Sequence, residues 1–378
     1  STGAERDLVD RRTPSVRFVA QPPIAPLRAA TPSTPLGRSF QARELDAAGR
    51  RAIATAVAGG VALIDFDADG DPDLVAVGAA RDRLWRNDRG RFVELPARLP
   101  RARDGAPGLG ALAGAYNNDG RADLLVLRHG SVSLVRNDGA GRFSDRTVAA
   151  GIQIGPAELP VSAAFVDYDH DGDLDLLVCG YLDLNATRAP ARFPDDFPSA
   201  AARLWRNNGN GTFSDLTKES TIGIARAPAV VATDYDERRD VDLMMASETG
   251  RVALFKNLRD GSFNDVARDV GLTAAGRLTA LAAADLNRDG RTDFLIGRAD
   301  GPASLALSTG RDRFRIETAP PALAGIVAAR FVDYDNDGLV DLLAWTPRDA
   351  RLLRNVGDGW VDATSQALAD PPGMLLPA

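Results

Sequence analysis

The sequence predicts an all-β protein, a β-propeller built from four-stranded sheets called blades. Three observations support this prediction: an acidic loop that recurs six times, steps of 48 to 67 residues between its copies, and short apolar segments on both sides of each copy. Four short strands in a period of about 50 residues are typical of a propeller blade. The composition agrees, since 44% hydrophobic residues and 36 glycines suit a sizeable core with many turns.

The best preserved acidic loop spans Asp167 to Asp175 and reads D-Y-D-H-D-G-D-L-D. Carboxylates repel one another, so a chain rarely crowds them unless a cation sits among them. Acids at positions 1, 3, 5 and 9, with a glycine at 6 and a carbonyl available at 7, are the beginning of a calcium loop. An EF-hand would place a glutamate at position 12, where this chain has Val178 inside an apolar run, so the loop joins strands rather than helices.

The six copies begin at residues 65, 115, 167, 234, 285 and 333 and are called loops 1 to 6. All their candidate ligands are oxygens, which selects a hard cation, and a flexible loop suits calcium better than magnesium. Loops 1, 3, 5 and 6 are predicted to hold four calcium ions, with position 7 giving its carbonyl. Their ligands are Asp65, Asp67, Asp69, Asp71 and Asp73; Asp167, Asp169, Asp171, Asp173 and Asp175; Asp285, Asn287, Asp289, Arg291 and Asp293; and Asp333, Asp335, Asp337, Leu339 and Asp341.

Loop 2 has lost its first acid, because Ala115 stands at position 1. It keeps Asn117, Asp119 and Asp123. With fewer carboxylates we expect weak binding or none, so this loop is a candidate for a fifth calcium only.

Loop 4, residues 234–242, breaks the pattern differently. Arg238 stands at position 5 and Arg239 replaces the glycine at position 6. A guanidinium among the remaining acids can pair with carboxylates in place of a metal. We therefore expect loop 4 to hold no calcium; its remaining acids are Asp234, Asp236 and Asp242.

The strand that follows each loop is apolar nearly throughout, which predicts burial on both faces and therefore blades stacked in a ring. A third strand ends in Arg-Asn or Lys-Asn in five copies, and a turn leads to a fourth strand that opens on an aromatic residue. Phe40 fits that aromatic position as well. We expect seven blades rather than six, because the two ends, residues 1–39 and 356–378, can complete a further blade. The fourth-strand aromatics are Phe92, Phe143, Phe213, Phe263, Phe314 and Trp360.

The predicted organisation is a proline-rich extended segment over residues 1–39 and a single propeller over 40–378, which strands from 1–39 can help to close. The step after loop 3 is longer than the others because of an insertion over residues 182–203. Its Phe193 and Phe197 either anchor a partner or pin the insertion to its own blade.

Charge and residue usage exclude several classes of function. The net charge of −7 argues against a nucleic-acid binder, and no apolar run reaches the 18 residues of a transmembrane helix. Two histidines, no nucleophile motif and no acid pair outside the loops argue against an enzyme. A lipid-anchored N-terminus is compatible with the sequence.

These motifs resemble the FG-GAP/VCBS repeats, which form the calcium-binding propellers of integrin α-subunit heads. The motifs are the D-x-D-x-D-G-x-x-D-L loops, the L-W-R-N strand and the N-N-G-N-G-T-F turn. Residues 165–217 are most similar to bacterial relatives of cartilage acidic protein. The resemblance covers about residues 40–365 and implies a calcium-binding propeller in a bacterial extracytoplasmic setting: periplasmic, outer-membrane-associated or secreted. It implies no reaction.

The leading functional hypothesis is a non-catalytic interaction or scaffold subunit of a bacterial envelope or extracellular assembly, with other proteins as partners and calcium as a structural staple. One alternative is a carbohydrate-binding propeller, for which Trp85, Trp205, Trp345 and Trp360 are candidate platforms. A hydrolase or lyase that uses the central channel is the other alternative.

Overall fold

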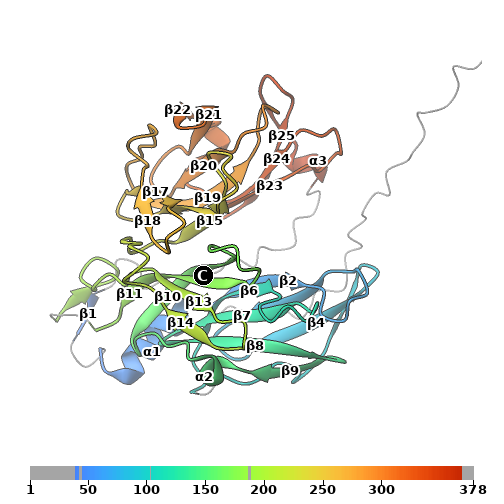
Figure 1. Cartoon of the computed structure of the whole chain (residues 1–378), viewed down its shortest axis with the longest axis vertical. Coiled ribbons are helices and arrows are strands. Elements are labelled where there is room, and N and C mark those ends of the chain that lie inside the picture. Colours follow the sequence, from blue (N-terminus) through green and yellow to red (C-terminus); the bar gives the residue numbers. More distant parts are fainter. Residues whose placement is uncertain (1–38, 42–44, 103, 186–188, 368–378) are drawn as a thin grey trace, which may run out of the picture.

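The computed structural model describes residues 39–41, 45–102, 104–185 and 189–367, and it is an all-β propeller of six blades (Figure 1). Each blade is an antiparallel sheet of four strands in chain order, without strand exchange between blades. Blades 1 to 3 form the lower half of Figure 1 and blades 4 to 6 the upper half. The predicted extended segment lies, except for Ser39, outside the described residues.

The strand bounds follow the predicted repeat. Blade 1 contains β2 (Gly60–Ile64), β3 (Asp73–Val77), β4 (Arg83–Asp88) and β5 (Arg91–Glu94), and blade 2 contains β6 (Gly108–Gly114), β7 (Asp123–Arg128), β8 (Ser131–Gly139) and β9 (Arg142–Asp145). Blade 3 contains β10 (Glu158–Val166), β11 (Asp175–Asp183), β13 (Arg203–Asn207) and β14 (Phe213–Asp215), and blade 4 contains β15 (Ala229–Thr233), β16 (Asp242–Ala246), β17 (Val252–Asn257) and β18 (Phe263–Asp265). Blade 5 contains β19 (Leu278–Ala284), β20 (Asp293–Arg298), β21 (Ser304–Gly310) and β22 (Arg313–Thr318), and blade 6 contains β23 (Ala328–Val332), β24 (Asp341–Trp345), β25 (Ala350–Asn355) and β26 (Trp360–Asp362).

The helices are short. They are α1 (Ala47–Ala56), α2 (Thr147–Ala150), α3 (Thr364–Ala367) and the 3-10 turn η2 (Pro321–Leu323). The Asp46 side chain caps α1 by accepting a hydrogen bond of 2.8 Å from the Gly49 N–H, which satisfies one of the free amides at a helix start. Over the described ranges, none of the helices has the length and apolar character needed to cross a membrane.

The core lies between successive blades rather than inside any one of them. Five hydrophobic clusters fill the five interfaces from blades 1 and 2 to blades 5 and 6. The second strands β7 and β16 are buried at every residue, as their continuous apolar sequences predict. A sheet of four strands therefore obtains its stability from its neighbours, because each face is covered by the next blade.

The preference for seven blades is wrong for the described chain, which forms six. Of the ends expected to complete a seventh, residues 1–38 and 368–378 lie outside the described part of the chain. Trp360 opens β26, the fourth strand of blade 6, and Phe40 belongs to β1 (Ser39–Phe40). Strand β1 pairs with β12 (Ala191–Arg192) in the insertion of blade 3, so the aromatic at residue 40 is not the fourth strand of a blade.

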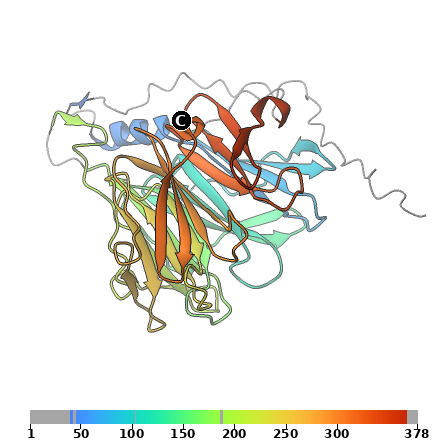
Figure 2. The same ribbon diagram turned by 90° about the horizontal axis from the view of Figure 1, so that it is seen from above.

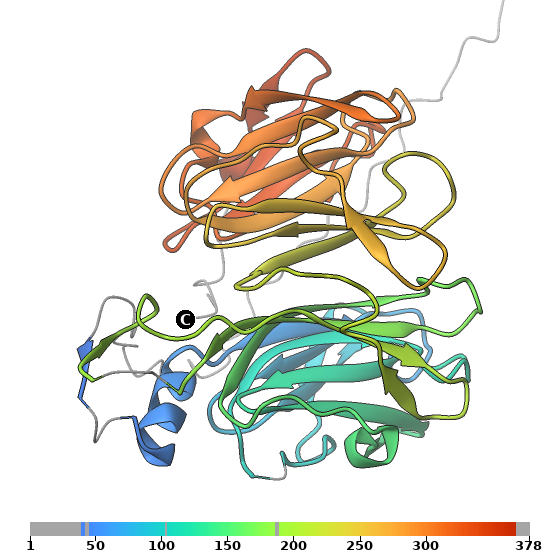
Figure 3. The ribbon, with the colours of Figure 1, turned by 60° about the vertical axis from the view of Figure 1, so that its left-hand side comes forward.

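The insertion is pinned to its own blade. Phe193 and Phe197 are buried, and the Phe197 ring packs edge-on against Phe193 and Phe40 at centroid distances of 5.6 and 6.4 Å. Ile53 of α1 completes this cluster. Figures 2 and 3 show α1 and the β1–β12 pair side by side at the edge of the molecule. The prediction that these two phenylalanines pin the insertion to its own blade is therefore confirmed.

Candidate metal centres

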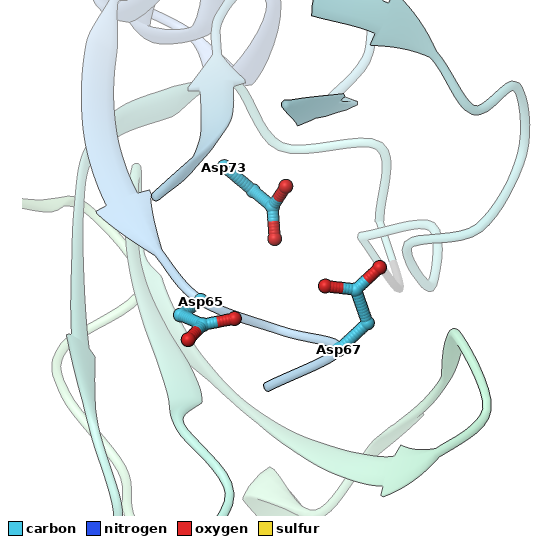
Figure 4. Close-up of side chains that lie close together, drawn as sticks. All are labelled: Asp65, Asp67 and Asp73. Atoms are coloured by element: carbon cyan, nitrogen blue, oxygen red, sulfur yellow. The ribbon is translucent and has the colours of Figure 1, made fainter. Parts of the chain in front are cut away.

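Each acidic loop joins the first and second strands of its blade, so position 1 follows one strand and position 9 opens the next. In loop 1 the carboxylates of Asp65, Asp67 and Asp73 point toward one another (Figure 4). One oxygen from each of these three carboxylates lies within 4.8 Å of the other two. Loops 3, 4 and 6 gather the same three positions: Asp167, Asp169 and Asp175; Asp234, Asp236 and Asp242; and Asp333, Asp335 and Asp341.

The loop backbone is the same in all six copies, including those with altered sequences. Position 4 has a φ between 55° and 61°, although it carries alanine, asparagine, histidine, glutamate or arginine. Position 6 is also left-handed, with a φ of 90° at Gly172 and 66° at Arg239. A side chain in this conformation costs about 1 kcal/mol. Loop 4 therefore keeps the shape of a calcium loop at an energetic cost.

The position-5 carboxylates lie outside these three-carboxylate groups. Asp69, Asp171 and Asp337 each accept a hydrogen bond of 2.8–3.0 Å from the N–H of position 7, and Asp119 and Asp289 do the same at 2.9–3.0 Å. This turn shapes the loop, and it leaves the second carboxylate oxygen of position 5 for another partner. A calcium ligand role for position 5 and for the carbonyl of position 7 stays a prediction.

The aspartate at position 9 is buried in every loop. Asp175 is fully buried and accepts hydrogen bonds from the N–H groups of Tyr168, at 3.1 Å, and Asn207, at 2.8 Å. It thereby ties its loop to the end of the third strand. Burial raises the pKa of Asp175 to about 7 and that of Asp123 in loop 2 to about 6. Loops 2 and 3 thus each contain an anion that is expensive to keep charged without a cation.

Unsatisfied carboxylate oxygens provide a test of whether these loops suit a metal. Oδ1 of Asp167 in loop 3, and Oδ1 of Asp333 and of Asp335 in loop 6, are buried and accept no hydrogen bond. Such atoms are rare, because a buried polar group without a partner costs about 1–3 kcal/mol. A calcium ion would satisfy them. Oδ2 of Asp123 in loop 2 and Oδ2 of Asp242 in loop 4 are also buried without a donor, so this feature is not confined to loops 3 and 6. The residues of loops 3 and 6 therefore fit calcium, and loop 1 gathers the same carboxylate triad.

Loops 2 and 5 are built differently because an asparagine occupies position 3. In loop 5 the Asn287 amide donates to Asp289 at 3.3 Å. In loop 2 the Asp119 carboxylate is paired with the Arg121 guanidinium at 2.5 Å. Loop 2 thus provides its own cation beside the main candidate ligand, and in loop 5 Arg291 lies 3.4 Å from Asp289 in the same way. Weak calcium binding by loop 2 stays a prediction.

The cation closest to the loop 4 carboxylates is a lysine that the sequence analysis did not predict for this role. The Lys256 ammonium at the end of β17 lies 2.6 Å from Oδ2 of Asp236. Arg238, the expected stand-in, approaches the same oxygen at 3.3 Å through Nε, and its side chain is about half exposed. Arg239 donates its backbone N–H to Asp234 at 2.9 Å. Lys256 therefore makes the closest contact, and the absence of calcium from loop 4 stays a prediction, since its three carboxylates gather as those of loops 1, 3 and 6 do.

A signal for this lysine was present in the sequence. The residue before the asparagine that recurs at the end of the third strand is basic in five blades: Arg86, Arg136, Arg206, Lys256 and Arg354. In blade 6, Arg354 pairs with Asp335 and lies 3.1 Å from Asp337. This basic residue lies beside the loop because neighbouring strands of the blade pair. Its distance from the loop along the sequence does not reveal that contact.

The tryptophans do not form a common platform. Trp85 and Trp205, which share a repeat position, are buried. The Arg83 guanidinium lies 4.5 Å from the centre of the Trp85 ring. Trp345 and Trp360 are only partly buried and come from different repeat positions. The two equivalent tryptophans are therefore packing residues.

The chain matches a family model described as FG-GAP-like repeat over residues 65–126, 116–178, 234–296 and 285–344. It is 27% identical over 321 residues to cartilage acidic protein 1 of Xenopus tropicalis, and 27% identical over 319 residues to that of Homo sapiens. Each alignment covers 74% of this chain and 45–46% of the relative. The chain thus spans about half the length of these curated relatives.

Two solved lectin structures share the fold. The BP39L lectin from Burkholderia pseudomallei superposes with a TM-score of 0.55 at 15% identity, over 80% of this chain and 83% of that one. A lectin from Agrocybe aegerita, described as recognising non-reducing terminal N-acetylglucosamine, superposes with a TM-score of 0.52 at 18% identity, over 80% and 79%. At these identities the likeness concerns the fold alone.

Proposed function

Because the chain belongs to the family of proteins built from FG-GAP-like repeats, we propose that it is a non-catalytic, calcium-stabilised propeller. It serves as an interaction or scaffold subunit of a bacterial envelope or extracellular assembly. The observation that supports the calcium role is the set of buried carboxylate oxygens without donors in loops 3 and 6. The metal neutralises the carboxylates and holds the hairpin between the first two strands of a blade.

The loop residues act on the fold rather than on a substrate. Asp167 and Asp169 would hold the ion from one strand end, and Asp175, which accepts two backbone N–H groups, would hold it from the start of the next strand. Calcium would supply charge compensation for these acids. Because this chain provides several oxygens per loop, the ion would act as a structural staple.

Calcium stoichiometry tests this proposal. Native mass spectrometry of the protein in calcium should show four bound ions, with a fifth weak one from loop 2. Asp171→Ala at position 5 of loop 3 should remove one ion, and Arg238→Ala at position 5 of loop 4 is the matched control that should remove none. No bound calcium at millimolar concentration, or equal losses in both variants, would refute the calcium role.

The interaction role has its own experiment. Affinity purification of the protein from its native source in calcium should retain defined partner subunits identified by mass. The same purification in EDTA should release them, since the propeller surface depends on the metal staples. Recovery of the protein alone under both conditions would contradict the scaffold proposal.

Carbohydrate binding is a second candidate, supported by two equivalent pockets between blades. One, of about 360 Å³, lies beside Tyr168, His170 and Arg259 between blades 3 and 4. The other, of about 340 Å³, is lined by Tyr116 and Arg136 and lies between blades 2 and 3. Pockets repeated around a propeller suit a multivalent ligand. A glycan array in calcium, with no hit at any sugar, would eliminate this candidate.

A further inference from the structure

The pocket between blades 3 and 4 has two arginines where the preceding blade has two glycines. This pocket, of about 360 Å³, is lined by loop 3, loop 4 and the β17–β18 turn, and we call it the arginine pocket. The pocket between blades 2 and 3 is built from the equivalent loops and turn. Arg239 of loop 4 and Arg259 of the turn line the arginine pocket. At the same two repeat positions, blade 3 has Gly172 and Gly209.

Both arginines have a left-handed backbone. The φ angle is 66° at Arg239 and 61° at Arg259, and it is 90° at Gly172 and 68° at Gly209. Glycine adopts this conformation without a steric cost, whereas the Cβ of arginine makes it unfavourable. Residues held in such a conformation gather at ligand sites, where the side chain is needed. Two of them in one pocket therefore point to a use for their guanidinium groups.

The guanidinium of Arg259 is held in place by the protein. Its Nε donates to Oδ1 of Asp240 at 2.6 Å, and its Nη2 donates to the carbonyl of Arg238 at 2.8 Å. The Asp240 side chain is only 8% exposed, and Nε2 of His170 lies 3.6 Å from the same carboxylate oxygen. Asp240 is thus neutralised, and Arg259 is fixed before any ligand arrives.

Arg239 supplies the uncompensated charge of the pocket. Its backbone N–H donates to Asp234, but over the described ranges its exposed guanidinium makes no hydrogen bond or ion pair. The two carboxylates that line the pocket are already engaged, since Asp240 pairs with Arg259 and Asp169 belongs to the acidic group of loop 3. Two guanidinium groups at one pocket are complementary to a carboxylate, which accepts hydrogen bonds from both.

The turn beside the pocket favours a peptide as the source of that carboxylate. Leu258, which precedes Arg259, is 46% exposed, whereas blade 3 has Asn208 at this position. An apolar side chain next to arginines suits a protein surface, because arginine is enriched at protein interfaces and apolar groups form their core. A sugar would instead present hydroxyl groups to this leucine.

We propose that the arginine pocket binds an acidic side chain, aspartate or glutamate, of a protein partner. The carboxylate lies between Arg239 and Arg259, and Leu258 contacts an apolar part of the same partner segment. The proposal rests on the interaction role proposed above and names the chemistry of the segment that is recognised, an acidic peptide.

Binding of a defined acidic peptide tests the proposal. Fluorescence anisotropy of labelled hexaglutamate with the full chain in calcium should show saturable binding that weakens as salt is added, and labelled hexaglutamine should not bind. Arg239→Gly should weaken hexaglutamate binding about tenfold, the loss expected for one hydrogen bond to a charged group. Because this variant restores the glycine of the other loops and removes the strained arginine, it should melt no lower than wild type.

Arg89→Gly is the matched control. It removes the same charge from an exposed arginine that has a φ of 53° in the corresponding turn of blade 1. Its affinity for hexaglutamate should stay within about twofold of wild type, as for an exposed charge without a partner. Absence of hexaglutamate binding, or equal affinities of the two variants, overturns the proposal. Tighter binding of an oligogalacturonate than of hexaglutamate also overturns it, because the occupant is then an acidic sugar.

Partner capture separates this proposal from the interaction role itself. Affinity purification with Arg239→Gly protein in calcium should lose a partner subunit that wild-type protein retains, while calcium stoichiometry stays the same. If the variant retains every partner, the interaction role stands and the role of the arginine pocket in it is overturned. If wild-type protein retains no partner, the interaction role fails, and the anisotropy measurement alone decides whether the pocket binds carboxylates.

Discussion

Loops 3 and 4 place the same three carboxylates in the same backbone, yet they compensate the charge differently. In loop 3, Asp167, Asp169 and Asp175 gather together, and Oδ1 of Asp167 is buried without a donor. In loop 4 the Lys256 ammonium contacts Asp236 directly. On the proposed calcium role, the two loops need a cation at the same place in the blade and obtain it from different sources. Metal dependence is then a property of individual blades.

Removal of calcium should have the largest effect. Each occupied site stabilises the folded state by about 2.7 kcal/mol when free calcium is 100 times the dissociation constant, so four sites together contribute on the order of 10 kcal/mol. We expect EDTA to lower the melting temperature by roughly 10–15 °C. Differential scanning calorimetry in calcium and in EDTA measures this shift. An unchanged melting curve would mean that loops 1, 3, 5 and 6 need no metal.

Replacement of the loop 4 cation should come next. Lys256→Met leaves Asp236 and Asp242 buried without their nearest positive charge, which costs about 3–5 kcal/mol. The loss of stability should be similar in calcium and in EDTA. By contrast, Asp169→Asn in loop 3 should lose stability only in calcium. Lys218→Met, at the exposed second lysine of the chain, is the control. Full stability of Lys256→Met in EDTA would disprove the role of this lysine.

The free energy of unfolding should change with pH in opposite directions in EDTA and in calcium. Burial raises the folded-state pKa of Asp175 above its unfolded value, to about 7, so the folded apo protein binds a proton more readily than the unfolded chain. In EDTA, stability should therefore fall as pH rises from about 4 through 7, by about 1–2 kcal/mol between pH 5.5 and 7.5. In calcium it should rise over that range, because the metal requires the ionised acid. Urea melts at both pH values measure the two slopes, and parallel slopes would contradict the prediction.

Conversion of loop 4 into a metal site should have the smallest effect on stability. The triple variant Arg238→Asp, Arg239→Gly and Lys256→Leu restores position 5, relieves the left-handed arginine and removes the protein cation. It should bind one more calcium than wild type and melt within a few degrees of it in calcium. Native mass spectrometry counts the ions. An unchanged count would show that the loop 4 backbone, not its cation, excludes the metal.

Much of the site could be predicted from sequence because its determinants are local. The nine residues of each loop contain their own turn, as the left-handed position 4 and the hydrogen bond from position 7 to position 5 show. The partners of the loops could not be predicted. Lys256 lies 20 residues from Asp236 along the chain, and Asn207 lies 91 residues from Tyr116. These contacts depend on strand pairing and on the stacking of neighbouring blades.

The sequence by itself determined the blade: its strands, its acidic hairpin and the burial of its second strand follow from patterns within about 50 residues. Only the tertiary structure decided how many blades form, because that depends on the destination of the chain ends. Phe40 pairs with the insertion of blade 3, and Trp360 completes blade 6.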